Sequence, residues 1–205
     1  MTVPAAHFID DLKRREYAVA LARYAVNGHH GRGVGDPIHE EVTEGRRKQY
    51  EDAMRAGAEW AKKMVPYQSC GDLIAWLLYR LGCRNERLVN RTADEGAVAW
   101  APVKNVTNIT GASGYRKAKG GAVPQPGDAL FLLQHGGHLA VLLEWDEARR
   151  VAVSADYGQP YGRLRERAIG PVHGGWTLGG VALDGWLDLD SVEWSASPDL
   201  TGTGL

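Results

Sequence analysis

The stretch "DALFLLQHGGHLAVLLEWDEARRVAVSADY" (residues 128–157) decides the fold class, because it alternates short apolar runs with turn-forming residues. Its runs are rich in Leu, Val and Ala and are separated by "QHGG" and "DEAR", a pattern typical of β-strands joined by short turns. Together with two later runs, the expected strands span 128–133, 138–145, 150–157, 163–169 and 180–192. Consecutive strands joined in this way predict an antiparallel meander.

Helices are expected ahead of these strands. Residues 8–27 carry apolar side chains at helical spacing, and residues 37–64 read as a mostly polar surface helix. Residues 70–81 are almost entirely apolar and are followed by Gly82, which predicts a buried helix that ends at that glycine. Residues 83–125 suggest no regular element. Helices followed by a meander predict an α+β fold, with a central helix packed on an antiparallel sheet of about five strands.

Composition narrows the functional classes. The chain has 205 residues, which is enough for one medium domain with its own core, so we expect neither disulfides nor a structural metal nor any other cofactor. Its 24 basic and 25 acidic residues give a formal net charge of -1, which argues against nucleic-acid binding. No apolar run reaches transmembrane length and no signal-like segment is present, so we expect a cytoplasmic chain as synthesised, without membrane insertion.

The two cysteines, Cys70 and Cys83, are expected to be free thiols. They lie 13 positions apart, and a helix of that length separates its ends by roughly 20 Å. A disulfide tolerates only ~4.4 to 6.8 Å between α-carbons.

Cys70 has the position of a catalytic nucleophile. Ser69 and Asp72 form a variant of the capping box, so Cys70 becomes the first helical residue. Unpaired N–H groups and the positive end of the helix dipole favour a thiolate there. Gly71 leaves room for a substrate carbonyl, and the N–H of Cys70 can stabilise an oxyanion. The alternative is an inert, buried thiol.

A nucleophilic cysteine requires a histidine and usually a third group that orients it. Of the seven histidines, only His138 opens a strand that reads as core. In a hairpin centred near Glu147, Asp156 lies directly opposite His138, within reach of the imidazole. If the register slips by one residue, Tyr157 would orient His138 in place of Asp156, and Gln159 is a further candidate for this role. The structural alternatives are a strand-end histidine and a turn-forming aspartate.

These segments resemble the NlpC and CHAP branches of the papain-like cysteine hydrolases. The resemblance rests on "SCGDLIAWLLYRLG", "PQPGDALFLLQHGGHLAVLLEW" and "VAVSADYGQP" and covers roughly residues 65–192. It implies a papain-like α+β fold, with Cys70 as nucleophile, His138 as general base and Asp156 as the orienting group. Tyr67 or Gln68, together with Gly71, would assist the oxyanion or the substrate.

The resemblance also implies a domain division and a substrate class. Residues 1–64 would form an N-terminal helical extension packed on the core, 65–195 the catalytic domain, and 196–205 a flexible tail. The implied reaction is cleavage of an amide bond through a thioester intermediate, with bacterial cell-wall peptide (peptidoglycan) as substrate. Delivery to the wall would then require lysis, a phage-type holin or a dedicated secretion machine, which makes a secretion or immunity protein a candidate partner.

Three other readings stay open. The first is a cysteine protease, deamidase or transferase that acts on an intracellular protein. The second is a non-catalytic binding module. The third is a zinc site on His135 and His138, which the sequence disfavours because no second pair of ligands with suitable spacing accompanies them.

Overall fold

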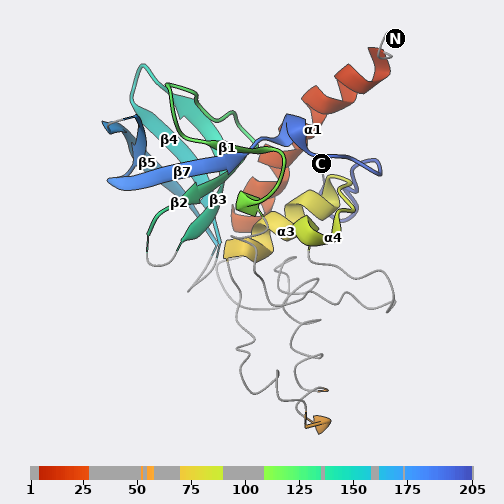
Figure 1. The fold of residues 1–205 in the computed structure, drawn as a ribbon. Helices are drawn as coiled ribbons and strands as arrows, with labels where there is room; N and C mark the ends of the chain where they lie inside the picture. The colour runs from red at the N-terminus through yellow and green to blue at the C-terminus, as the bar shows by residue number, and fades with distance from the viewer. Residues whose placement is uncertain are drawn as a thin grey trace.

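The computed structural model describes residues 5–27, 52, 55–57, 70–89, 109–134, 137–157, 162–172 and 174–204. In this part of the chain, six antiparallel strands close into a barrel, and the helices lie together on one side of it (Figure 1). A seventh, short strand pairs with one edge of the strand that closes the barrel.

The helices are α1 (Ala5–Asn27), α3 (Cys70–Arg80), α4 (Glu86–Val89) and the short 3-10 helix η4 (Leu189–Ser191). The strands are β1 (Tyr115–Lys117), β2 (Ala129–Leu132), β3 (His138–Asp146), β4 (Val151–Asp156), β5 (Arg163–Val172), β6 (Gly175–Leu178) and β7 (Val181–Leu187). None of the helices in these described ranges is long and apolar enough to cross a membrane.

Strand β7 closes the barrel. One of its edges pairs with β2 over Leu183–Leu187. Its other edge is divided, because Val181–Leu183 pairs with β6 and Gly185–Leu187 pairs with β1. At Gly185 a β-carbon would lie 2.2 Å from the carbonyl oxygen of Arg116, so only glycine allows β1 to approach this closely.

The predicted papain-like α+β fold, with a central helix on an antiparallel sheet of about five strands, is wrong. The antiparallel meander is present, since β2 to β7 each pair with the next strand along the chain. However, β7 returns to pair with β2 as well, so the sheet closes into a barrel, and α3 packs on the outside of this barrel. Two short strands, β1 and β6, lie where the sequence predicts none.

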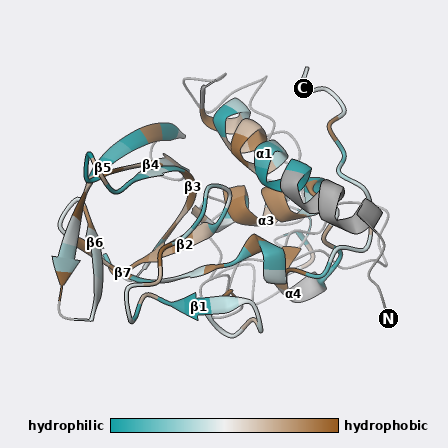
Figure 2. Cartoon of the chain, turned by 90° about the horizontal axis from the view of Figure 1, so that it is seen from above, coloured by the Kyte–Doolittle hydropathy of each residue, from teal (hydrophilic) through white to brown (hydrophobic). Residues whose placement is uncertain are grey.

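The described residues form two apolar clusters. The first lies among the strands alone, and its large members include Leu130, Leu142, Ile169 and Trp186. The second lies between the barrel and the helices and contains Trp76, Leu77 and Leu21 beside Leu139, Val141 and Phe131. Alternate residues of a strand point to opposite faces, so β3 supplies Leu142 to the first cluster and Val141 to the second. Figure 2 shows the apolar side of α3 beside β3.

The predicted helix over 70–81 is confirmed, with its last helical residue at Arg80. Gly82 follows in a left-handed conformation with a φ of 99°, and the N–H of Cys83 donates to the carbonyl of Leu78 at 2.9 Å. This is the bond that closes a glycine C-cap. A β-carbon on Gly82 would lie 2.0 Å from the carbonyl oxygen of Ala196, so the cap also holds the C-terminal segment.

The expected extension and tail both contact the helical layer. Helix α1 packs on β3, β4, β5 and α3. Arg80 donates to the carbonyl of Thr201 at 2.9 Å, and the hydroxyl of Tyr24 donates to the carbonyl of Gly202 at 3.2 Å. The segment assigned to a tail is therefore packed on α1 and α3 at these contacts. The predicted surface helix over 37–64 lies outside the described residues, apart from 52 and 55–57.

Arg15 fastens α1 to one end of the barrel. Its guanidinium contacts Asp128 at 2.8 Å, Asp190 at 2.9 Å and Asp188 at 3.0 Å, and it also donates to the carbonyl of Pro126 at 3.0 Å. Asp128 is only 1% exposed, and it also accepts the N–H groups of Gln125 and Leu189. The Pro-Gly-Asp turn of the sequence is thus a structural joint between α1, β2 and the end of β7.

Replacing Arg15 by Ala is expected to destabilise the fold by about 3 kcal/mol, because it leaves the buried Asp128 carboxylate without its cation. The measurement is urea unfolding at neutral pH. Arg149→Ala is the matched control, since Arg149 pairs with Glu144 and Asp146 on an exposed turn, where ion pairs contribute little. Equal unfolding midpoints for the two variants would contradict this role for Arg15.

Candidate active site

One end of the barrel gathers the predicted site residues. His138 is the first residue of β3 and Asp156 is the last residue of β4, so the antiparallel pair brings both to the same end. Cys70 is the first residue of α3, whose start lies beside that end of β3 (Figure 1). The topology therefore brings together three residues that are up to 86 positions apart in the chain, since 156 − 70 = 86.

His138 and Asp156 are in direct contact, with 2.9 Å between Nε2 and Oδ2. The predicted register is wrong, because Asp156 pairs with Ala140 and not with His138. At the turn end Val151 pairs with Asp146, three residues from the predicted register, and the bulge between Leu142 and Glu144 reduces the displacement to two at Asp156. Because the displacement is two residues, Asp156 stays on the same face as His138 and reaches it diagonally.

Cys70 is the second partner of His138. Burial lowers the pKa of His138, but hydrogen bonds with Asp156 and with the Cys70 side chain, and the charges of both groups, outweigh burial and raise the pKa from its ordinary value of 6.5 to about 9. The ring atom that contacts Asp156 is Nε2. At neutral pH the imidazole is therefore protonated and lies between two groups that can carry negative charge.

Asp156 is held as a buried carboxylate. Its side chain is 5% exposed; Ser154 donates to Oδ1 at 2.6 Å and Arg167 donates to Oδ2 at 2.5 Å. Burial acts to raise the pKa of Asp156, but the hydrogen bonds from His138 and Ser154 and the charge of Arg167 lower it below the usual value. Arg167 also donates from Nε to the hydroxyl of Ser154 at 3.1 Å. These contacts fix the carboxylate that orients His138.

The other predicted site residues divide into two groups. Gly71 is buried at the second position of α3, and Tyr157 is buried in the cluster between barrel and helices, on the opposite face from Asp156. Tyr157 is therefore not the residue that contacts His138. Tyr67, Gln68 and Gln159 lie outside the described residues, as do the N-cap Ser69 and His135.

The sequence reasoning missed Ser154, Arg165 and Arg167. Ser154 pairs with Arg165 across β4 and β5, and Arg165 also approaches Asp156, with 3.3 Å between Nε and Oδ2. A signal was present, because the run "RLRER" places arginines at alternate positions of a strand next to the one that carries Asp156. Alternate residues of a strand share a face, so these arginines can lie on the same face of the sheet as the carboxylate of Asp156.

The described residues contain no group of three or more His, Cys, Asp or Glu side chains placed to hold a metal. Cys83 is a free, buried thiol, and burial raises its pKa. Cys70, which is partly exposed, is also free, so no disulfide joins the two. The arrangement around Cys70 is chemically suited to nucleophilic attack by a sulfur with a proton donor beside it.

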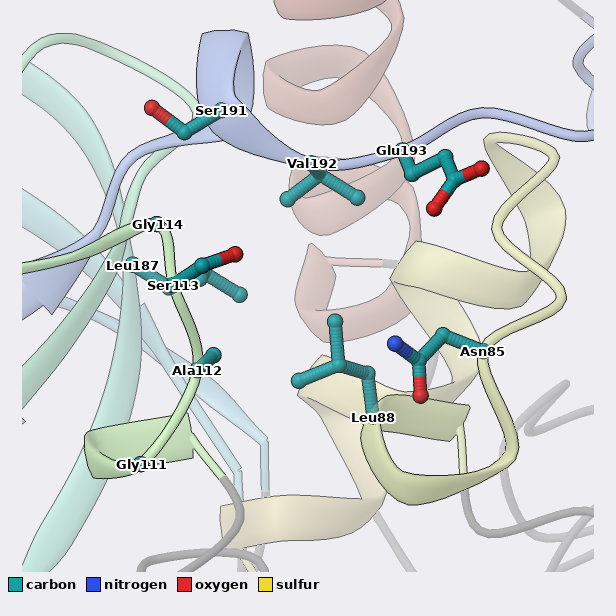
Figure 3. A pocket seen from close by; sticks show the side chains of 10 residues that line it. All are labelled: Asn85, Leu88, Gly111, Ala112, Ser113, Gly114, Leu187, Ser191, Val192 and Glu193. Atoms are coloured by element: carbon teal, nitrogen blue, oxygen red, sulfur yellow. The ribbon is translucent and has the colours of Figure 1, made fainter.

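A pocket of about 400 Å³ lies elsewhere, at the end of α3 opposite Cys70 (Figure 3). Its lining is formed by Asn85, Leu88, Gly111, Ala112, Ser113, Gly114, Leu187, Ser191, Val192 and Glu193. None of these described lining residues is a histidine or cysteine, and residues 90–108, which connect two of its walls, lie outside the described part of the chain. We therefore assign the chemistry to the Cys70 end of α3.

In comparisons with known proteins, no protein-family model, no curated protein and no solved structure matches the chain. The function must therefore be argued from the site itself.

The raised pKa of His138 predicts a pH-dependent contribution to stability. Since the folded value of about 9 exceeds the unfolded value of 6.5, this contribution is present below about pH 6.5 and is lost as the pH rises through about 9. NMR titration of the His138 ring should give a midpoint near 9, and Asp156→Asn should lower it towards 6.5.

Asp146→Asn is the control for this titration, because Asp146 lies at the other end of β3 and pairs with Arg149. It should leave the His138 midpoint unchanged. A wild-type midpoint near 6.5 would show that Asp156 and Cys70 do not hold the proton on His138.

Proposed function

We propose that the protein is a cysteine hydrolase that cleaves an amide bond through a thioester intermediate. The observation that carries the proposal is the position of His138, which lies 2.9 Å from the buried carboxylate of Asp156 and whose pKa is also raised by the side chain of Cys70. A nucleophile, a base and an orienting carboxylate in this order recur on unrelated folds. The barrel architecture therefore does not weigh against the reaction.

In the acylation step, the Cys70 thiolate attacks the carbonyl carbon of the substrate amide, and the carbonyl electrons move to oxygen. The N–H of Cys70 lies at the start of α3, where helix N–H groups have no intrahelical partner, so it can donate to this oxyanion. As the intermediate collapses, the C–N bond breaks and the protonated His138 gives its proton to the leaving amine. The product is a thioester on Cys70.

In the deacylation step, the neutral His138 takes a proton from water while the water oxygen attacks the thioester carbonyl. The C–S bond breaks, the carboxylic acid leaves, and the thiolate and imidazolium are restored. Asp156 stays ionised throughout and stabilises the imidazolium each time it forms. Ser154 and Arg167 keep the carboxylate in place.

For the substrate, we carry forward bacterial cell-wall peptide, which is supported by the sequence motifs around Cys70 and His138 alone. For that substrate the enzyme must reach the cell wall, and a lysis or secretion partner would deliver it. The site geometry supports the reaction class independently of the substrate.

Purified protein should release amines from peptidoglycan, and Cys70→Ala should reduce this release to background. His138→Ala should reduce it by about 100-fold or more, the usual contribution of a general acid–base group. Cys83→Ala is the matched control, because that thiol is buried at the other end of α3, and it should retain activity.

A parallel assay with short peptide amides separates the reaction from its substrate. Activity on peptide amides without activity on peptidoglycan would refute the cell wall as substrate and leave the mechanism intact. Amide cleavage that survives Cys70→Ala would refute the mechanism.

A further inference from the structure

Arg165 places a partly exposed guanidinium at the edge of the site, where Asp156 is its ion-pair partner. It lies on the same face of β5 as Arg167 and as Ile169, which packs inside the barrel. Arg167 is 6% exposed and is bound to both Asp156 and Ser154. By contrast, 36% of the Arg165 side-chain surface is exposed. The two arginines therefore differ in role although they share a face.

The hydrogen-bonding capacity of Arg165 is largely unused. Its Nε lies 3.3 Å from Oδ2 of Asp156, but this buried nitrogen makes no hydrogen bond. Across the part of the chain that the structure describes, the Arg165 side chain forms no other ion pair or hydrogen bond. A guanidinium has five N–H donors arranged for two-point contact with a carboxylate. Among the described residues nothing pairs with its terminal amino groups, so these groups can bind a ligand.

The charges around Asp156 favour an anion. One carboxylate contacts three cationic groups, namely the imidazolium of His138 and the guanidinium groups of Arg165 and Arg167. Even with a thiolate at Cys70, the cluster carries one more positive than negative charge. An added carboxylate would balance this excess, and no other carboxylate of the described residues is paired with these three cations.

From this arrangement we infer that Arg165 binds a carboxylate of the substrate, so that the preferred amide lies close to a free carboxylate. The inference rests on the proposed function, because that function places the scissile amide at Cys70. Cys70 interacts electrostatically with His138, His138 lies 2.9 Å from Asp156, and Asp156 lies 3.3 Å from Arg165. This chain of contacts places the carboxylate within about two residues of the scissile bond, at ~3.3 to 3.6 Å per extended residue.

The test uses alkylation of Cys70 and so requires no knowledge of the natural substrate. The probes are iodoacetyl-glycine and iodoacetyl-diglycine, each compared with its C-terminal amide. The sulfur displaces iodide from the iodoacetyl carbon, which forms a C–S bond, and intact-mass and peptide analysis gives the rate at Cys70. In the wild-type protein at least one acid should react about tenfold faster than its amide, the effect of one charge-assisted bidentate contact.

Arg165→Gln should abolish this preference, and Arg165→Lys should retain only part of it because it keeps the charge but loses the planar fork. Arg149→Gln is the control, because it removes the same charge at the other end of the barrel and should keep the wild-type ratio. Circular dichroism checks that each variant is folded, and the Lys variant provides the test if the Gln variant is not.

Two results would overturn the inference. One is a wild-type acid-to-amide ratio no greater than that of Arg165→Gln for both probe lengths. The other is an equal slowing of acid and amide by Arg165→Gln, which would make Arg165 only a positioning residue for Asp156. A preserved acid preference without hydrolysis of any amide would instead count against the proposed reaction and leave the carboxylate site standing.

Discussion

Closure of the barrel through β7 is the constraint on which the rest of the structure depends. Once β7 pairs with both β2 and β6, alternate residues of every barrel strand are enclosed. Most of this interior is filled with apolar side chains such as Leu130, Leu142 and Ile169. At the end where β3 begins and β4 ends, however, the inward positions carry charge. Those charges must satisfy one another, since a buried, unpaired charge is costly.

Asp156 meets this requirement and thereby defines the site. Its two oxygens accept hydrogen bonds from Ser154 and Arg167 and contact His138, so β3, β4 and β5 are linked at one point. The same contacts keep the carboxylate ionised and hold the imidazole in a fixed orientation. Helix α3 begins at Cys70, whose side chain also interacts electrostatically with that imidazole. The stabilisation of the barrel end and the preparation of the nucleophile therefore use the same side chains.

Local patterns in the sequence predicted the parts of this arrangement that local physics determines. The apolar run after Cys70 predicted the buried helix, and Gly82 predicted where that helix ends. The Leu- and Val-rich runs predicted the strands that carry His138 and Asp156. Barrel closure could not be predicted, because it depends on pairing between β2 and β7, about 50 residues apart, and on β6, whose four residues show no clear alternation.

The register of β3 with β4 and the roles of Arg165 and Arg167 also depend on strand pairing that the sequence does not reveal. Nothing in the composition of β3 marks a bulge between Leu142 and Glu144, and its effect is visible only when the strands pair. The expected contact of His138 with Asp156 exists because Asp156 is displaced by two residues from the predicted register, which keeps its side chain on the same face of the sheet as His138. Arg165 and Arg167 occupy positions that could have been recognised by their alternation, but assigning them to the site required knowing which strand lies beside β4.

The central claim is that His138 and Asp156 prepare Cys70 for nucleophilic attack. The most direct measurement is the rate at which iodoacetamide alkylates Cys70 at neutral pH, followed by mass spectrometry in the wild-type protein and in His138→Gln. The account predicts rapid, selective modification of Cys70 over Cys83, and a fall of about tenfold or more when His138 is replaced. An equal rate at Cys70 in both proteins would contradict it.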